Sequence, residues 1–236
     1  MLDIIFPRFC VSCKQYSQNN QLCPDCFSDI NYINPETVCV SCGVPYNYFS
    51  EFTSRSPHKC SYCLTEKVHY SVCRSVAYLD GTIRELLHNF KYRKKLGLGR
   101  LFSKLIIDNF PKDLLGFDLI IPVPLHIKKL REREYNQSAI LVNGISGKLR
   151  CEKDLFSLVK SRETEPQVNF KNSKIRKKNV VKSFSVRDVK KVEKRSILLV
   201  DDVYTSGSTI NECARVLIES GAVDVRALTL LRAVDI

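Results

Sequence analysis

Two adjacent carboxylates, Asp201 and Asp202, directly follow the apolar run Ile197 to Val200. A short apolar run of this kind is typical of a buried strand. In open α/β sheets, ligands bind beyond the carboxyl ends of the strands. A carboxylate pair at that position can accept hydrogen bonds from the 2′- and 3′-hydroxyls of a ribose, so this pair is the first candidate for chemistry.

A short segment rich in hydroxyl groups follows the carboxylates. Tyr204 to Thr209 supplies hydroxyls and backbone N–H groups, and Gly207 permits a tight turn. A helix from near Ser208 to Glu219 would point the positive end of its dipole at a bound phosphate. An ordinary polar turn between a strand and a helix is the alternative interpretation. We predict a sugar-phosphate site formed by Asp201, Asp202, Tyr204, Thr205, Ser206, Gly207, Ser208 and Thr209.

Eight of the eleven cysteines form four Cys-x-x-Cys pairs within the first 63 residues. Each pair can present two thiolates to one ion, and two pairs complete a tetrahedral Cys₄ zinc site. A single pair could instead be a redox site, but four pairs close together favour two structural zinc ions. Sequential pairing is the first choice and an interleaved arrangement is the alternative. The predicted ligands are Cys10, Cys13, Cys23, Cys26, Cys39, Cys42, Cys60 and Cys63.

The charge of the chain is unevenly distributed. Residues 1–73 hold five Lys/Arg and six Asp/Glu, whereas residues 74–236 hold 32 and 19, a net charge of +13. A positive surface attracts phosphorylated ligands or nucleic acid, although it also serves solubility alone. The sequence has no apolar run long enough to span a bilayer and no basic secretion signal, so we expect no membrane insertion and a cytoplasmic location.

The remaining pattern predicts an α/β fold, with a mainly parallel sheet and helices on both faces. We expect a small zinc-ribbon module over residues 1–73 and a larger domain over residues 74–236. The expected strands cover residues 75–79, 118–123, 197–200 and 223–231, and the expected helices cover residues 82–92, 98–110, 138–149 and 208–219.

The segment from Lys160 to Arg195 is strongly basic, with thirteen Lys/Arg and four Asp/Glu, and we expect a mobile surface arm. Together with the basic connector Lys91-Tyr92-Arg93-Lys94-Lys95, it is a candidate surface for nucleic acid. Tyr92, Phe170 and Phe184 are candidate stacking platforms, although each could be a core aromatic. The predicted nucleic-acid residues are Tyr92, Arg93, Lys94, Lys95, Lys171, Lys174, Arg176, Lys177 and Lys178.

The run from Asp201 to Thr209 resembles the 5-phosphoribosyl-1-pyrophosphate (PRPP) motif of type I phosphoribosyltransferases. The order of the other motifs along the chain resembles the ComF family of competence proteins, which includes ComFC-like and GntX-like members. Besides the cysteine pairs, the motifs are Lys91-Tyr92, Ile121-Pro122-Val123-Pro124-Leu125, Arg131-x-Arg133-x-Tyr135-Asn136-Gln137, Thr164-x-x-Gln167 and Arg176-x-x-Asn179. Glu134 departs from the family pattern, which usually has Gly at this position.

The resemblance implies a double zinc ribbon on a phosphoribosyltransferase-like domain that handles incoming single-stranded DNA in natural transformation. Arg131 and Arg133 would contact pyrophosphate as guanidinium forks, and Mg²⁺ would accompany PRPP. An active phosphoribosyltransferase with an unknown acceptor is one alternative. Because Thr205 stands where 6-oxopurine enzymes of the superfamily carry an acid, purine salvage is disfavoured. A scaffold that docks a DNA-uptake helicase, with a vestigial ligand site, is the other alternative.

Overall fold

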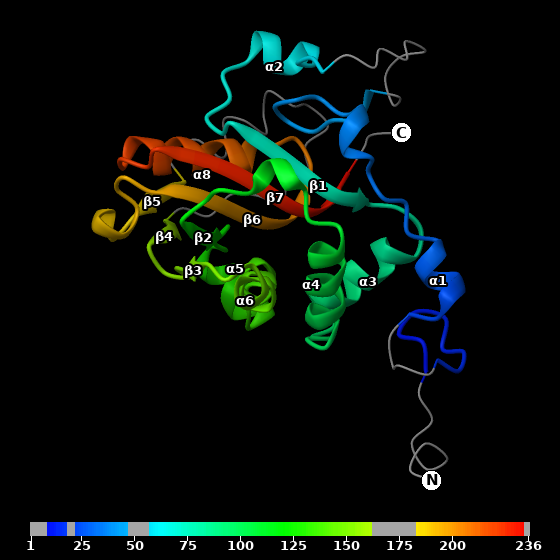
Figure 1. Cartoon of the computed structure of the whole chain (residues 1–236). Coiled ribbons are helices and arrows are strands. Elements are labelled where there is room, and N and C mark those ends of the chain that lie inside the picture. Colours follow the sequence, from blue (N-terminus) through cyan, green and yellow to red (C-terminus); the bar gives the residue numbers. More distant parts are fainter. Residues whose placement is uncertain (1–8, 18–21, 47–56, 162–182, 234–236) are drawn as a thin grey trace.

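A five-stranded parallel sheet organises the larger part of the molecule (Figure 1). The structure is a computed structural model and describes residues 9–17, 22–46, 57–161 and 183–233. The strand order is β1-β7-β6-β2-β3. The strands are β1 (Val72–Tyr78), β2 (Leu119–Pro122), β3 (Glu152–Lys153), β6 (Ser196–Tyr204) and β7 (Asp224–Arg232).

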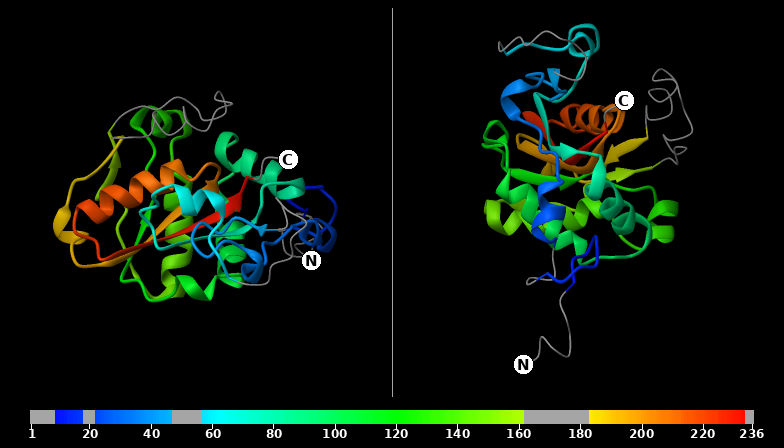
Figure 2. Two further views of the ribbon diagram at one scale, coloured as in Figure 1. Left: turned by 90° about the horizontal axis from the view of Figure 1, so that it is seen from above. Right: turned by 90° about the vertical axis from the view of Figure 1, so that its right-hand side faces the viewer.

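The central strand β6 has apolar side chains on both of its faces, which is why its sequence does not alternate with polar residues. Leu198 and Val200 pack into the core beneath helices on one face, whereas Ile197 and Leu199 pack into the core on the other. The first face is covered by α3 (Gly81–Tyr92), α4 (Leu98–Asp108) and α6 (Gln137–Leu149), and the second by α8 (Ser208–Glu219) (Figures 1 and 2). This confirms the predicted fold class.

The remaining described elements are short. The helices α1 (Pro24–Ser28) and α2 (Ser61–Thr65) belong to the cysteine-rich part, and α5 (Ile127–Arg133) precedes α6. A separate antiparallel pair joins β4 (Leu158–Lys160) to β5 (Phe184–Val186). Single 3-10 turns span Pro35–Thr37, Lys112–Leu114 and Val189–Lys191.

The cysteine-rich segment wraps around the edge strand β1. Ile33 donates its backbone N–H to Val76 (3.0 Å) and Tyr78 donates to Asn31 (2.9 Å), so the segment adds an antiparallel bridge to this edge. The first cysteine-rich part, with α1, lies on the side of α3 and α4, and the second, with α2, lies on the side of α8 (Figures 1 and 2). The predicted boundary between residues 73 and 74 therefore falls inside β1.

Two predictions about element limits need correction. The strand expected to end at Val200 continues to Tyr204, and Asp201 lies opposite Thr229 within the ladder, because the adjacent β7 extends to Arg232. The basic arm expected from Lys160 to Arg195 is structured from residue 183 onward. There, β5 pairs with β4 and Val192 is buried; residues 162–182 lie outside the described residues.

Candidate functional site

Three elements converge on the carboxylate pair near the carboxyl end of β6. Ser138, in the first turn of α6, donates its Oγ hydrogen to Asp201 Oδ1 at 2.9 Å. The backbone N–H of Asp202 donates to the same oxygen at 2.9 Å. Lys91 Nζ, from the last turn of α3, lies 2.7 Å from Asp202 Oδ1. Neither Ser138 nor Lys91 was predicted for this site from the sequence, although both lie in or beside the motifs that carry the family resemblance.

Asp201 occupies an unusual environment for a carboxylate. Burial raises its pKa to about 7, the charge of Asp202 adds to the rise, and Lys91 and the Ser138 hydroxyl oppose it. Removing a charged carboxylate from water is costly unless donors replace the lost hydration. A ligand that brings vicinal hydroxyl groups would supply such donors, which fits the predicted ribose site.

The loop after β6 is built around Gly207. This residue has a φ of +74°, and a Cβ at its position would lie 2.1 Å from Tyr204 Oη. Ser206 Oγ and Ser208 Oγ are hydrogen-bonded at 2.9 Å. Helix α8 begins at Ser208, as predicted, and its N-cap Gly207 has no side chain to cap the first turn. Backbone N–H groups at such a helix start are suited to binding a phosphate.

Tyr204 supports this loop from inside the molecule. Its side chain is buried, its hydroxyl is hydrogen-bonded to Tyr70 Oη at 3.1 Å, and the Arg232 guanidinium lies 3.9 Å from its ring centroid. Burial raises the pKa of Tyr204, so the phenol remains neutral. Because its hydroxyl is hydrogen-bonded to Tyr70, Tyr204 would contribute to the predicted ligand site through its backbone.

The two predicted pyrophosphate arginines differ in their surroundings. Arg131 is exposed on α5. Arg133 donates to Tyr92 Oη at 3.1 Å and to Gln137 Oε1 at 3.3 Å, and its guanidinium lies 4.8 Å from the Tyr92 ring centroid. Glu134 ends α5 with a φ of 69°, in the left-handed region. A glycine, which is usual at this position in the ComF pattern, would adopt this conformation without strain. Glu134 adopts it with strain, and its carboxylate pairs with Lys94.

The predicted nucleic-acid residues are only partly described. Tyr92 is exposed, with Arg133 against one face of its ring, and Arg93, Lys94 and Lys95 are exposed beside it. Phe184 is 5% exposed and packs in the core, so its prediction as a stacking platform is wrong. The other predicted residues lie outside the described part of the chain: Phe170, Lys171, Lys174, Arg176, Lys177 and Lys178.

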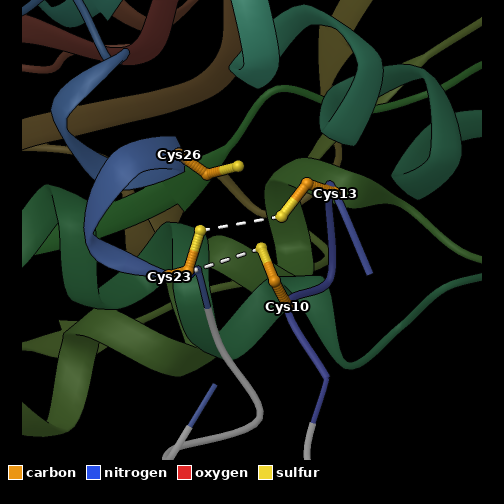
Figure 3. Close-up of side chains that lie close together, drawn as sticks. All are labelled: Cys10, Cys13, Cys23 and Cys26. Carbon is orange, nitrogen blue, oxygen red and sulfur yellow. Dashed lines mark hydrogen bonds between the residues drawn. The ribbon is translucent and has the colours of Figure 1, made fainter. Parts of the chain in front are cut away.

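The cysteines form two groups of four that follow the sequential pairing. One group contains Cys10, Cys13, Cys23 and Cys26, and the other contains Cys39, Cys42, Cys60 and Cys63; in each, the sulfurs lie within 4.8 Å of one another. Figure 3 shows the first group, with two knuckles whose sulfurs face a common centre.

The spacing of the sulfurs fits zinc. The Cys13 and Cys23 sulfurs are 3.6 Å apart, as are those of Cys42 and Cys60. Tetrahedral Zn–S bonds place sulfurs about 3.8 Å apart. Hydrogen bonds with the Cys42 and Cys60 thiols lower the pKa of Cys39, and the same coupling raises the pKa of Cys42, so Cys39 is the thiolate partner of that pair. Each group would hold one Zn²⁺ with no open coordination position, so its role is structural.

Comparison with known proteins agrees with both modules. Residues 1–64 match the double zinc ribbon domain, and residues 136–234 match the phosphoribosyl transferase domain. The DNA utilization protein YhgH of Shigella flexneri is 29% identical over 202 residues, covering 84% of this chain and 85% of that protein. Competence protein F of Haemophilus influenzae is 25% identical over 232 residues, covering 95% of this chain and 96% of that protein. Competence protein ComFC of Bacillus subtilis is 26% identical over 221 residues, covering 84% of this chain and 85% of that protein.

Solved structures of phosphoribosyl enzymes are more distant. A hypoxanthine phosphoribosyltransferase from Staphylococcus aureus is 12% identical, with a TM-score of 0.38 over 62% of this chain and 71% of that one. Glutamine PRPP amidotransferase from B. subtilis is 19% identical, with a TM-score of 0.35 over 59% of this chain and 26% of the enzyme's own length.

Among the residues that the structure describes, no helix combines the length and hydropathy that a membrane crossing requires.

Proposed function

Because the chain joins a double zinc ribbon to a phosphoribosyltransferase domain and is homologous to competence and DNA utilization proteins, we propose that it binds PRPP or a related phosphoribosyl ligand and handles single-stranded DNA during DNA uptake in the cytoplasm. The observation that carries the ligand proposal is the Asp201–Asp202 pair, of which Asp202 is buried, with Ser138 and Lys91 beside it and an uncapped helix start beyond it.

Each part of this site has a role in the proposal. Asp201 and Asp202 accept hydrogen bonds from the ribose 2′- and 3′-hydroxyls, and the ion pair with Lys91 orients the Asp202 carboxylate. The backbone of the loop from Thr205 to Thr209 donates to the 5′-phosphate. Mg²⁺ bound with PRPP would neutralise the charge of the pyrophosphate. Mg²⁺ is usually bound by one or two protein carboxylates together with substrate phosphates, and Asp201 and Asp202 fit this pattern.

The DNA part of the proposal rests on homology and charge. The excess of Lys/Arg lies in residues 74–236, and Arg93 and Lys95 expose two of these charges beside Tyr92. Such a surface neutralises backbone phosphates without reading sequence. The affinity should therefore depend strongly on salt and weakly on base composition.

Calorimetry with PRPP and Mg²⁺ tests the ligand site. The wild-type protein should bind PRPP, and the double variant Asp201→Asn/Asp202→Asn should lose binding. Asp224→Asn is the matched control, because Asp224 pairs with Arg226 at the opposite, amino end of β7. If the wild-type protein does not bind PRPP, or if the double variant binds equally well, the ligand proposal is refuted.

Fluorescence anisotropy with a labelled single-stranded oligonucleotide tests the DNA surface. The logarithm of the affinity should fall with the logarithm of the salt concentration, with a slope of about −0.7 per neutralised phosphate. Arg93→Ala/Lys95→Ala should make that slope shallower, whereas Asp201→Asn/Asp202→Asn should leave it unchanged. Binding that does not respond to salt would refute the electrostatic model.

A second candidate function is phosphoribosyl transfer to an unidentified acceptor. It is favoured by Asp201, a carboxyl group whose pKa of about 7 suits proton exchange near neutral pH. Incubation with PRPP, Mg²⁺ and a panel of nucleobases, followed by measurement of released pyrophosphate, tests it. Acceptor-dependent release by the wild-type protein, and none by Asp201→Asn, would establish the activity; no release with any base would refute it for those acceptors.

A further inference from the structure

A cavity of about 520 Å³ lies between the second cysteine group and the loop that follows β6. One wall comes from the zinc-ribbon segment, through Tyr46, His58 and Tyr62. The other wall comes from the larger domain, through Thr205, Ser206 and Arg232. Its size falls in the range of small-molecule sites, roughly 300–1,000 Å³. Neither module forms this cavity alone.

The ribbon wall presents aromatic rings in a fixed arrangement. The rings of Tyr46 and His58 stack with centroids 4.0 Å apart and an interplanar angle of 11°. The Tyr46 hydroxyl donates to the His58 carbonyl (2.5 Å) and accepts from the His58 backbone N–H (3.1 Å), which fixes this pair. Tyr62 sits between the ligands Cys60 and Cys63 on α2. Preformed aromatic faces are what proteins use to stack nucleobases.

The opposite wall supplies a buried cation. Arg232 is 3% exposed, packs on the Tyr204 ring and donates from Nη2 to the Cys42 carbonyl, which links the two modules. Its Nε is buried with no hydrogen-bond partner among the described residues. The Arg232 side chain also lines the cavity, so an acceptor placed there would meet a cation rather than an apolar wall. The carbonyl oxygens and ring nitrogens of nucleobases are acceptors of this kind.

Thr205 and Ser206 belong both to the cavity wall and to the loop assigned to phosphate binding. A nucleotide whose phosphate occupies the loop would therefore have its base within reach of the aromatic wall. We propose that this cavity is a nucleobase site for a 5′-phosphorylated nucleotide, and that the second zinc ribbon forms its wall. The proposal rests on the proposed phosphoribosyl function, since the same loop holds the phosphate.

Two sources could supply this ligand, a free mononucleotide or the 5′-phosphorylated end of single-stranded DNA. The fluorescent base 2-aminopurine distinguishes them, because stacking quenches its emission and the chain contains no Trp to interfere. The probes are 2-aminopurine riboside 5′-monophosphate and a 5′-phosphorylated oligonucleotide with 2-aminopurine at its first position. PRPP, which has no base, is the reference ligand in calorimetry.

The variants remove one ring of the wall at a time. Tyr62→Ala and His58→Ala should each weaken binding of the quenched probe about tenfold, because each removes a ring on which the base stacks. PRPP affinity should stay within about twofold of wild type. Tyr16→Ala is the matched control, because Tyr16 is 61% exposed beside the first cysteine group and outside the cavity; it should change neither affinity. Elemental analysis should still find two zinc ions in each variant.

The outcomes separate the two proposals. If PRPP does not bind the wild-type protein, the proposed function fails. If PRPP binds but neither probe is quenched, or if both ring variants bind the quenched probe as tightly as wild type, the nucleobase site is refuted. Quenching of the mononucleotide alone assigns the site to free nucleotides, and quenching of the oligonucleotide assigns it to DNA ends. Equal quenching of an oligonucleotide without the 5′-phosphate would overturn the link to the loop.

Discussion

Replacement of Gly207 by Ala tests the geometry of the phosphate loop most directly. Gly207 has a φ of +74°, and an added Cβ would lie 2.1 Å from Tyr204 Oη and 2.5 Å from Tyr204 Cζ. Tyr204 has little room to retreat, because it is 4% exposed, hydrogen-bonded to Tyr70 and covered by Arg232. The loop itself must therefore move.

The expected cost has two parts. An alanine in the left-handed region costs roughly 1–2 kcal/mol. Overpacking against a fixed ring typically costs about 1–3 kcal/mol more. Gly207→Ala should thus lower the free energy of unfolding by about 2–5 kcal/mol, which most domains survive because they have about 5–15 kcal/mol in total. Displacement of the loop should also weaken PRPP binding at least tenfold.

Urea unfolding followed by circular dichroism measures the stability, and calorimetry measures PRPP binding. Gly147→Ala is the matched control, since Gly147 is exposed within α6 and a Cβ there would have no atom within 4 Å. That variant should be more stable by up to about 1 kcal/mol, as alanine suits a helix better than glycine. If Gly207→Ala matched wild type in both stability and PRPP affinity, the assigned loop geometry would be wrong.

Three further predictions follow from particular side chains. The pKa of Asp201 is about 7 in the folded protein, above its ordinary value of 3.8. Between these two pH values the native protein holds a proton that the unfolded chain has released. The contribution of Asp201 to stability therefore falls as pH rises from about 4 to 7. Asp201→Asn should remove this decline; urea unfolding at pH 5 and pH 8 measures it, and an unchanged pH dependence would contradict it. Elemental analysis should find two zinc ions per chain and one in Cys39→Ser, whose second ribbon should become protease-sensitive; full zinc content in that variant would contradict the site. Glu134→Gly should raise the free energy of unfolding by up to about 1 kcal/mol, because it removes left-handed strain and the exposed ion pair with Lys94 that it loses contributes little. A loss of stability in thermal unfolding would refute this.

The features of this protein that depend on neighbouring residues could be predicted from the sequence. The apolar run before Asp201, the glycine at 207 and the helix from Ser208 to Glu219 are local patterns, and the structure reproduces them. The spacing of the cysteines likewise indicated two four-cysteine zinc sites. Such features are readable because strand and helix periodicity, turn geometry and metal-ligand spacing act over a few residues.

Which distant residues come into contact depends on how the strands and helices are arranged in three dimensions. The sheet order places Ser138 against Asp201 across 63 residues of sequence, brings Lys91 to Asp202, and extends β6 past its apolar run because β7 lies beside it. It also buries Phe184, which composition had suggested for stacking. Sheet order depends on burial summed over the whole chain, so no local pattern reports it. The cavity between the second ribbon and the phosphate loop arises for the same reason.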